Sequence, residues 1–375
     1  MDVFSTMKPV KLSERFGICQ WFHFNDFYNV QRSVKLLQDL GIHHLRTGIS
    51  WADYHRPGGR QWYDWLFSAL QPFELLVSVW HTPPSLSEGN SCSSPPRRLL
   101  DYADFIDTII TAHGKAWTAL ELWNEPNNRY KWDFPRYDPG WEKFASMVGS
   151  AAFWARQRHV RTVLGGMMPV DPEWLALMKM RGVTAHTDVV GIHGFPGMWW
   201  PRLPNWEWFS HWAGWTDKID QICAVTRDLP VWVTETGFAT WDHNQSTPGR
   251  HQEQVFYLNE ATQVPVSRLY WYCLLDLDPA REAIEGFHVD ENEYHLGLVT
   301  HEGVLKPAYH TLRKLLRQNR NSAEYLQADA HQTGAPGSDR SSKSATPRYT
   351  KPSQAGMFWK IKKRVARCRP DQGSG

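Results

Sequence analysis

The sequence predicts an α/β fold, a single (β/α)8 barrel of the TIM type, and three observations support this prediction. Eight short apolar runs alternate with longer segments of helical periodicity. The runs start at intervals that average about 36 residues, which is the length of one strand with its helix. The runs are also apolar almost without interruption, as strands buried on both faces of a parallel sheet are.

The predicted strands lack the polar alternation of a half-exposed strand, as the runs FELLVSVW and VWVTET illustrate. They cover residues 16–22, 44–50, 73–80, 118–124, 161–166, 188–193, 231–236 and 268–275. An open doubly wound sheet is the alternative arrangement for such units. That alternative usually carries a GxGxxG motif after its first strand, and none is present there.

The segments between the strands have the spacing of amphipathic helices. Residues 26–40 place Val30, Val34 and Leu37 three or four positions apart, and Gly41 follows where a C-cap glycine belongs. Similar patterns cover residues 99–112 and 208–227, and a last helix over residues 306–316 closes the barrel. Eight strand–helix units in succession make a barrel of ordinary size.

The composition changes after the last predicted helix, so the barrel domain is assigned to residues 1–318. Residues 319–356 are rich in Ser, Ala, Gln, Pro and Gly, which predicts a disordered linker. Residues 357–375 form a basic tail that contains MFWKIKKRVARCR, with apolar residues at helical spacing. Residues 357–369 are therefore either a short basic amphipathic helix that contacts an anionic membrane or a solvated charged tail.

The formal net charge of +2 is distributed unevenly. Residues 340–375 hold ten Lys or Arg residues and one acid, Asp371, so the preceding chain is mildly acidic. This distribution is typical of an enzyme for neutral substrates and argues against nucleic acid as the main ligand. The N-terminal segment lacks the apolar stretch of a secretory signal. We therefore expect a cytoplasmic protein, which would be peripheral at the inner membrane face if the tail is a membrane-binding helix.

Two glutamates occupy the positions that glycosidic bond cleavage requires in a barrel. The chemistry needs two carboxyl groups on either side of the anomeric carbon, and barrel enzymes place such groups at C-terminal strand ends. Glu125 ends the predicted fourth strand in ALELWNEPNNRY, and Glu235 ends the seventh in VWVTETGF. Pro126 terminates the one strand, and Gly237 permits a sharp exit from the other. The alternative is that both glutamates only form structural ion pairs.

LWNEPN and VTETGF together resemble the fourth-strand and seventh-strand motifs of clan A glycoside hydrolases, across roughly residues 15–317. The resemblance implies a retaining mechanism in which Glu125 is the general acid/base and Glu235 is the nucleophile. It also implies that Arg46 keeps the nucleophile ionised and that Asn124 binds the sugar 2-hydroxyl. Trp271 in LYWYCLLD matches the aromatic platform of the clan beneath the sugar in subsite −1.

Two histidines and a tryptophan-rich segment are further candidates for substrate binding. His193 ends the predicted sixth strand, where several families of the clan place a His or Tyr. His81 follows the third strand and is as easily explained as a structural residue. The chain contains 21 Trp, six of them between residues 199 and 215, and their flat faces suit sugar rings. Trp200, together with Trp199 and Trp206, is expected to wall the sugar site, whereas Trp212 and Trp215 are expected in the core.

No metal or cofactor is predicted. There is no HExxH motif, and the mechanism implied by the resemblance to clan A requires neither a metal nor a cofactor. Within the clan, the motifs resemble those of the family 39 β-xylosidases and of the cellulase-like family 5. They predict hydrolysis of β-linked or arabinofuranosyl glycosides through a covalent intermediate. A transglycosidase, a silent sugar-binding barrel and a scaffold in polysaccharide synthesis are the alternatives. The sugar, its linkage, exo or endo action and the oligomeric state stay open.

Overall fold

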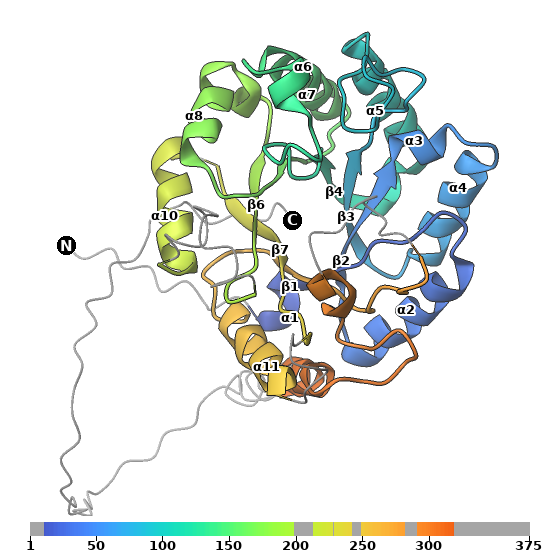
Figure 1. The fold of residues 1–375 in the computed structure, drawn as a ribbon, viewed down its shortest axis with the longest axis vertical. Helices are drawn as coiled ribbons and strands as arrows, with labels where there is room; N and C mark the ends of the chain where they lie inside the picture. Colours follow the sequence, from blue (N-terminus) through green and yellow to red (C-terminus); the bar gives the residue numbers. More distant parts are fainter. Residues whose placement is uncertain (1–10, 199–212, 228, 242–248, 282–290, 319–375) are drawn as a thin grey trace, which may run out of the picture.

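The computed structural model describes residues 11–198, 213–227, 229–241, 249–281 and 291–318, and these residues form a closed parallel barrel (Figure 1). Each strand pairs with the next, and β8 returns to β1, which confirms the predicted fold class. The strands are β1 (Phe16–Cys19), β2 (His44–Ser50), β3 (Glu74–Trp80), β4 (Trp117–Leu122), β5 (Thr162–Met167), β6 (Val189–Gly194), β7 (Val231–Thr236) and β8 (Leu269–Tyr272).

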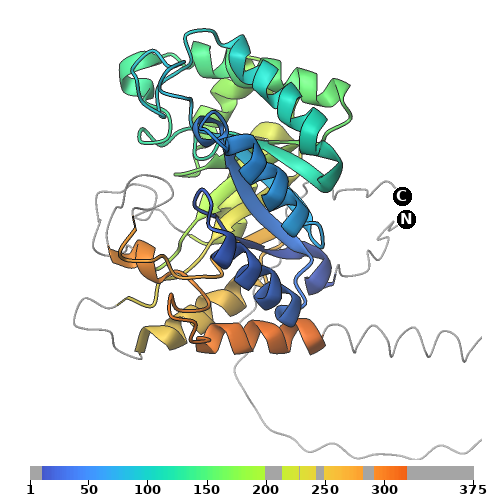
Figure 2. The ribbon, with the colours of Figure 1, turned by 90° about the vertical axis from the view of Figure 1, so that its right-hand side faces the viewer.

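Helices lie on the outside of the barrel, as Figure 1 and the side view in Figure 2 show. They are α1 (Leu12–Arg15), α2 (Phe27–Leu40), α3 (Trp51–Tyr54), α4 (Gly59–Ala69), α5 (Leu100–His113), α6 (Phe134–Tyr137), α7 (Glu142–Gln157), α8 (Pro172–Met180), α10 (Trp215–Thr226) and α11 (Gly249–Ala261). Short 3-10 turns occur at Gly114–Ala116, Val183–Ala185 and Glu291–His295. None of these described helices is long and apolar enough to cross a lipid bilayer.

The ends of α2 follow directly from the sequence. The Asp26 side chain caps its first turn by accepting a hydrogen bond from the Asn29 backbone N–H. Gly41 ends it in the left-handed conformation with φ 74°, as expected of a C-cap glycine. The final helix, over residues 307–318, packs beside α2 because the Tyr309 hydroxyl donates to Asp39 at 2.9 Å. The predicted linker and basic tail lie outside the described residues.

The pairing of β1 with β8 determines which side chains of these strands enter the barrel. Gly17 pairs with Tyr270, Ile18 with Trp271, and Cys19 with Tyr272. The Cys19 side chain contacts Arg46 and Glu235, so it faces the interior. Because neighbouring paired residues share a face and successive residues alternate, Tyr270 and Tyr272 also face inward. Trp271 consequently faces outward and is fully buried between the barrel and its helices.

A buried ion pair fixes the segments that follow β7 and β8. The Lys306 ammonium group donates to Asp276 at 2.8 Å, to the Thr240 hydroxyl at 3.0 Å and to the His295 carbonyl at 3.2 Å. Asp276 also accepts from the backbone N–H of Gly297 at 2.7 Å. These bonds tie the segments that carry Thr240, Asp276 and His295 to the start of the final helix.

Candidate active site

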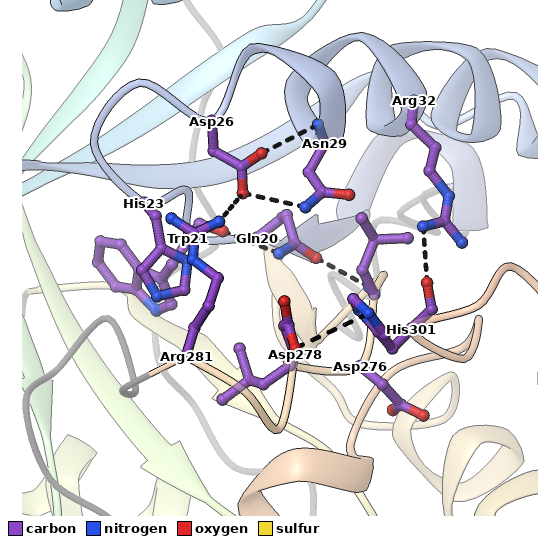
Figure 3. A pocket seen from close by; sticks show the side chains of 12 residues that line it. Gln20, Trp21, His23, Asp26, Asn29, Arg32, Asp276, Asp278, Arg281 and His301 are labelled. Carbon is purple, nitrogen blue, oxygen red and sulfur yellow. Dashed lines mark hydrogen bonds and ion pairs between the residues drawn. The ribbon is translucent and has the colours of Figure 1, made fainter.

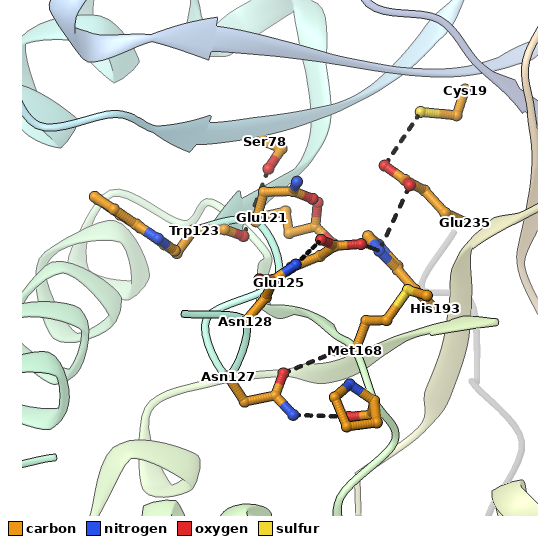
Figure 4. Close-up of polar contacts among 12 residues, drawn as sticks. Cys19, Ser78, Glu121, Trp123, Glu125, Asn127, Asn128, Met168, His193 and Glu235 are labelled. Carbon is orange, nitrogen blue, oxygen red and sulfur yellow. Dashed lines mark hydrogen bonds and ion pairs between the residues drawn. The ribbon is translucent and has the colours of Figure 1, made fainter. Parts of the chain in front are cut away.

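The two predicted catalytic glutamates converge at the mouth of the barrel (Figure 4). Glu125 follows β4 and Glu235 lies near the end of β7, and both residues are buried. His193, from β6, lies between them. One oxygen of each carboxylate and a ring nitrogen of His193 lie within 4.8 Å of one another. Residues more than one hundred positions apart in sequence thus form one polar cluster.

The backbone at the end of β4 is bent so that Glu125 turns into the mouth. Trp123 and Glu125 both adopt left-handed conformations, with φ 76° and 44° respectively. Such values are unfavourable for residues other than glycine, and they concentrate at functional sites. The turn is held because the Asn128 backbone N–H donates to the Glu125 carbonyl at 2.9 Å and the Trp123 indole donates to the Lys131 carbonyl at 3.2 Å.

Arg46 of β2 lies beneath the cluster and connects three carboxylate or amide side chains. Its guanidinium donates to Glu235, and it contacts one oxygen of Glu121 at 2.8 and 2.5 Å. It also donates to the Asn124 amide oxygen at 2.8 Å. Arg46 and Glu121 are both fully buried, so the ion pairs are not screened by water. The cation favours the ionised form of Glu235, as a nucleophile requires.

Asn124 is fixed by Arg46 in an orientation that leaves its amide nitrogen available. The Asn124 oxygen accepts from the guanidinium, so the Nδ2 group is directed away from the cation. Within the described part of the chain, this buried Nδ2 group has no hydrogen-bond partner. A buried donor without a partner is costly, and a ligand hydroxyl would satisfy it.

The Glu125 carboxyl group has a different environment from that of Glu235. Burial raises the pKa of Glu125, and the Lys131 charge and the Asn128 hydrogen bond only partly oppose this effect. Its Oε2 accepts from the Asn128 amide at 3.0 Å, and its Oε1 lies 3.0 Å from His193 Nδ1. A raised pKa favours the protonated form, which is the form that a general acid needs.

The position of His193 depends on a glycine in the neighbouring strand. Gly166 of β5 adopts φ 29°, and a Cβ atom there would collide with the imidazole Nε2 of His193. With glycine at this position, the ring fits between the strands. Its Nδ1 then lies 3.5 Å from Glu235 and 3.0 Å from Glu125, between the two carboxylates.

The structure brings five of the eight predicted site residues into this cluster: Arg46, Asn124, Glu125, His193 and Glu235. His81 directly follows β3, and its ring lies against that of Trp80 at a tilt of 33°, with centroids 3.6 Å apart. Burial and the Lys131 charge lower the pKa of His81 to about 3, so it is neutral. Trp200 lies outside the described residues.

Trp271 is not brought into the mouth, contrary to the expectation of an aromatic platform there. Its side chain has no exposed surface and faces the surrounding helices. The neighbouring residue, Tyr272, faces the mouth instead and is only half-buried. Its ring meets Phe195 edge to face, with centroids 6.2 Å apart. The expected position of Trp271 is wrong, because an apolar strand without polar alternation does not indicate which face points inward.

Sequence reasoning also missed residues that contact the predicted ones. Glu121 holds Arg46, Asn128 contacts Glu125, and Cys19 places its thiol 3.2 Å from Arg46 and 3.8 Å from Glu235. Glu121 had a detectable signal, since an acid four residues before Glu125 in a predicted buried strand requires a buried partner. Cys19 gave no such signal, because a thiol in an apolar strand is usually core.

The arrangement of Glu125, His193 and Glu235 is the one cluster with metal-binding geometry that we find among the described residues. The three groups can each offer one ligand atom. However, the Arg46 guanidinium already bonds Glu235, and its positive charge opposes a second cation at that carboxylate. The donor set therefore fits a metal poorly.

A small polar cavity lies beyond the ends of β1 and β8 (Figure 3). It has a volume of about 30 Å³, which accommodates about two water molecules and no sugar ring. Its rim is held by an ion pair between Arg281 and Asp26 at 2.9 Å and by His301 beside Asp278 at 3.8 Å. Trp21 separates this cavity from Arg46, over which its ring lies at 5.0 Å. The cavity is thus a polar recess that none of Glu125, His193 and Glu235 lines.

Comparisons with solved structures support the same architecture. A family 5, subfamily 18 enzyme from Bifidobacterium longum subsp. longum, crystallised with Manβ1-4GlcNAc, superposes with a TM-score of 0.62 at 17% identity. The match covers 82% of this chain and 78% of that enzyme. A family 39 β-xylosidase from Caulobacter crescentus gives a TM-score of 0.57 at 16% identity, over 82% of this chain and 72% of the other.

A family 39 glycoside hydrolase from Bacteroides cellulosilyticus also matches, with a TM-score of 0.55 at 16% identity. That match covers 81% of this chain, but this chain spans only 64% of the length of that enzyme. The sequence matches no protein-family profile. It also matches no curated protein. At these identities the structural likeness establishes the fold, and the activity has to be argued from the site.

Proposed function

We propose that this protein is a retaining glycoside hydrolase that cleaves β-linked glycosides. The observation that carries the proposal is the pair of carboxylates from β4 and β7, whose nearest oxygens lie within 4.8 Å. Retaining enzymes place the two carboxyl groups about 5–5.5 Å apart, whereas inverting enzymes leave about 6.5–9.5 Å for a water molecule. The different surroundings of the two groups support separate roles for them.

In the first step, a Glu235 carboxylate oxygen attacks the anomeric carbon and forms a covalent glycosyl ester. Glu125 donates its proton to the glycosidic oxygen, so the leaving group departs as a neutral alcohol. Arg46 keeps Glu235 ionised before the attack. The elevated pKa of Glu125, caused by burial, keeps this group protonated at the start of the cycle.

In the second step, Glu125 is a carboxylate and acts as the general base. It takes a proton from a water molecule as that water attacks the anomeric carbon, and the bond to Glu235 breaks. Asn128 stabilises this charged form of Glu125 through its amide N–H. Both residues return to their starting states, and the anomeric configuration is retained.

The surrounding residues are proposed to bind the sugar in subsite −1. The unpartnered Asn124 amide is available to the sugar 2-hydroxyl, where a hydrogen bond strengthens in the transition state. Tyr272 takes the platform role first assigned to Trp271, since its ring faces the mouth beside Phe195. His81 is neutral and offers a polar edge next to Trp80.

The substrate class proposed is a β-glycoside, with β-xylosides and β-mannosides as the first compounds to test. Those sugars are chosen because the structural neighbours include a β-xylosidase and an enzyme crystallised with Manβ1-4GlcNAc. Aryl β-glycosides of xylose, mannose, glucose, galactose and arabinose form a suitable panel. Turnover of at least one compound is the expected result.

Three variants test whether turnover depends on the proposed residues. Glu235→Gln should abolish activity, and Glu125→Gln should reduce it by a factor of about 10² or more on poor leaving groups. Glu260→Gln, an exposed position on α11, is the matched control and should leave the rate unchanged. Activity that survives Glu235→Gln would contradict the assignment of the nucleophile.

A further inference from the structure

Asn128 is held at both ends of its side chain, in the loop that follows β4. Its Nδ2 donates to Glu125 Oε2 at 3.0 Å, and its Oδ1 accepts from the Tyr130 backbone N–H at 3.1 Å. Its carbonyl accepts from the backbone N–H groups of Lys131 at 2.9 Å and Trp132 at 3.0 Å. The residue therefore has one conformation imposed by its own loop.

The two bonds of the side chain also settle the orientation of its amide group. The backbone N–H of Tyr130 is only a donor, so the atom that faces it must be the amide oxygen. The amide nitrogen then faces Glu125, and it is only a donor. Oε2 of Glu125 is consequently kept as an acceptor in every protonation state of the carboxyl group.

This constraint has a consequence for the proton of the acid form. A carbonyl oxygen accepts a hydrogen bond better than a hydroxyl oxygen does, so the proton of Glu125 is directed to Oε1. Oε1 lies 3.0 Å from Nδ1 of His193 and on the side of Glu235. The proton is thereby held on the oxygen that points toward the other carboxylate, where the glycosidic bond is expected.

We propose that Asn128 is a positioning residue of the reaction, which fixes the oxygen on which Glu125 carries its proton and stabilises Glu125 as a carboxylate for the second step. The proposal rests on the proposed function. The Asn128 amide thus acts in both steps. The same N–H donor directs the Glu125 proton to Oε1 before proton transfer and stabilises the Glu125 carboxylate afterwards.

The adjacent residue, Asn127, offers a matched comparison. Its side chain is also held at both ends, since it donates to the Pro169 carbonyl at 2.7 Å and accepts from the Met168 N–H at 2.8 Å. These bonds join the loop to the end of β5, and neither involves Glu125 (Figure 4). Substitution of Asn127 therefore disturbs the same loop without removing the donor to the carboxyl group.

The ionisable groups around Glu125 come from several elements and stay unchanged in the test variants. They are Lys131 of the same loop, Glu121 of β4, Arg46 of β2, His193 of β6 and Glu235 of β7. A change in the titration of Glu125 on substitution of Asn128 is therefore assigned to the lost donor when the Asn127 variant does not show it.

The test is a ¹³C NMR titration of the full-length protein with ¹³C-carboxyl glutamate, using Glu125→Gln to assign the Glu125 signal. Asn128→Ala removes a donor to the charged form and should raise the pKa of Glu125 by about one unit. Asn128→Asp should raise the pKa further, because it adds a like charge. Asn127→Ala should leave it unchanged. Equal pKa values in the Asn128→Ala and Asn127→Ala proteins would overturn the proposal.

A kinetic measurement separates failure of this inference from failure of the proposed function. On an aryl glycoside with a poor leaving group, the alkaline limb of kcat/KM should move upward in Asn128→Ala by the same amount as the NMR titration. If the limb persists in Glu125→Gln, Glu125 is not the acid/base and the proposed function is wrong. If the limb disappears in Glu125→Gln but does not move in Asn128→Ala, only the role of Asn128 is refuted.

Discussion

Replacement of Arg46 by Met should destabilise the protein strongly, because its guanidinium forms ion pairs with two buried carboxylates, Glu121 and Glu235. Glu121 has no exposed surface, and the Glu235 side chain is 5% exposed. Removing one member of a buried ion pair costs about 3–5 kcal/mol. With two carboxylates affected, we expect the free energy of unfolding to fall by at least the upper part of this range, about 4–5 kcal/mol.

Urea unfolding at neutral pH measures this change. The double variant Arg46→Met/Glu121→Gln should regain part of the loss, since one of the two uncompensated charges is removed. Arg158→Met is the matched control, because Arg158 pairs with Asp107 at 2.7 Å but both side chains are more than two-fifths exposed. It should cost less than about 1 kcal/mol. An Arg46→Met cost equal to that of the control would refute the reasoning about buried charge.

Three further predictions concern single side chains of the site. Burial raises the pKa of Glu125, so ionisation of this group opposes folding. The Glu125→Gln variant and the wild type should therefore be equally stable below about pH 4. The variant should become the more stable protein as the pH rises through the pKa of Glu125 in the folded state. Calorimetric scans across pH measure this difference, and a variant that is less stable at neutral pH would contradict it. Gly166→Ala should displace His193 and lower kcat/KM by a factor of about 10 or more, which steady-state kinetics and near-UV circular dichroism would detect together. Tyr272→Ala should raise KM with little loss of stability, whereas Trp271→Ala should lower the free energy of unfolding by about 3–5 kcal/mol. A raised KM in Trp271→Ala together with an unchanged KM in Tyr272→Ala would indicate that Trp271 is the platform.

The fold could be predicted from the sequence because the barrel repeats one simple pattern. Eight apolar runs at regular spacing locate eight strands, and each described strand overlaps its predicted range. The ends differ by a few residues where turns begin. For example, the predicted fourth strand extends to Asn124, whereas β4 ends at Leu122, because Trp123 adopts a left-handed conformation.

The site was predictable where a motif fixes both the residue and its strand end. Glu125 and Glu235 follow from the chemistry of two carboxyl groups, and Arg46, Asn124 and His193 follow from the resemblance. Trp271 was wrongly placed, because the inward face of β8 is set by its register with β1 and not by its own composition. Glu121 and Asn128 contact the predicted residues Arg46 and Glu125, and such contacts can be seen only in the three-dimensional structure.

Covalent trapping tests the central claim most directly. The full-length protein is incubated with 2-deoxy-2-fluoro-β-glycosyl fluorides of several sugars, and its intact mass and labelled peptide are measured by mass spectrometry. The account predicts a mass gain of one fluorosugar on Glu235 with at least one probe, and no gain in Glu235→Gln. Labelling at another residue, or no labelling by any probe while aryl glycosides are still hydrolysed, would contradict a retaining mechanism through Glu235.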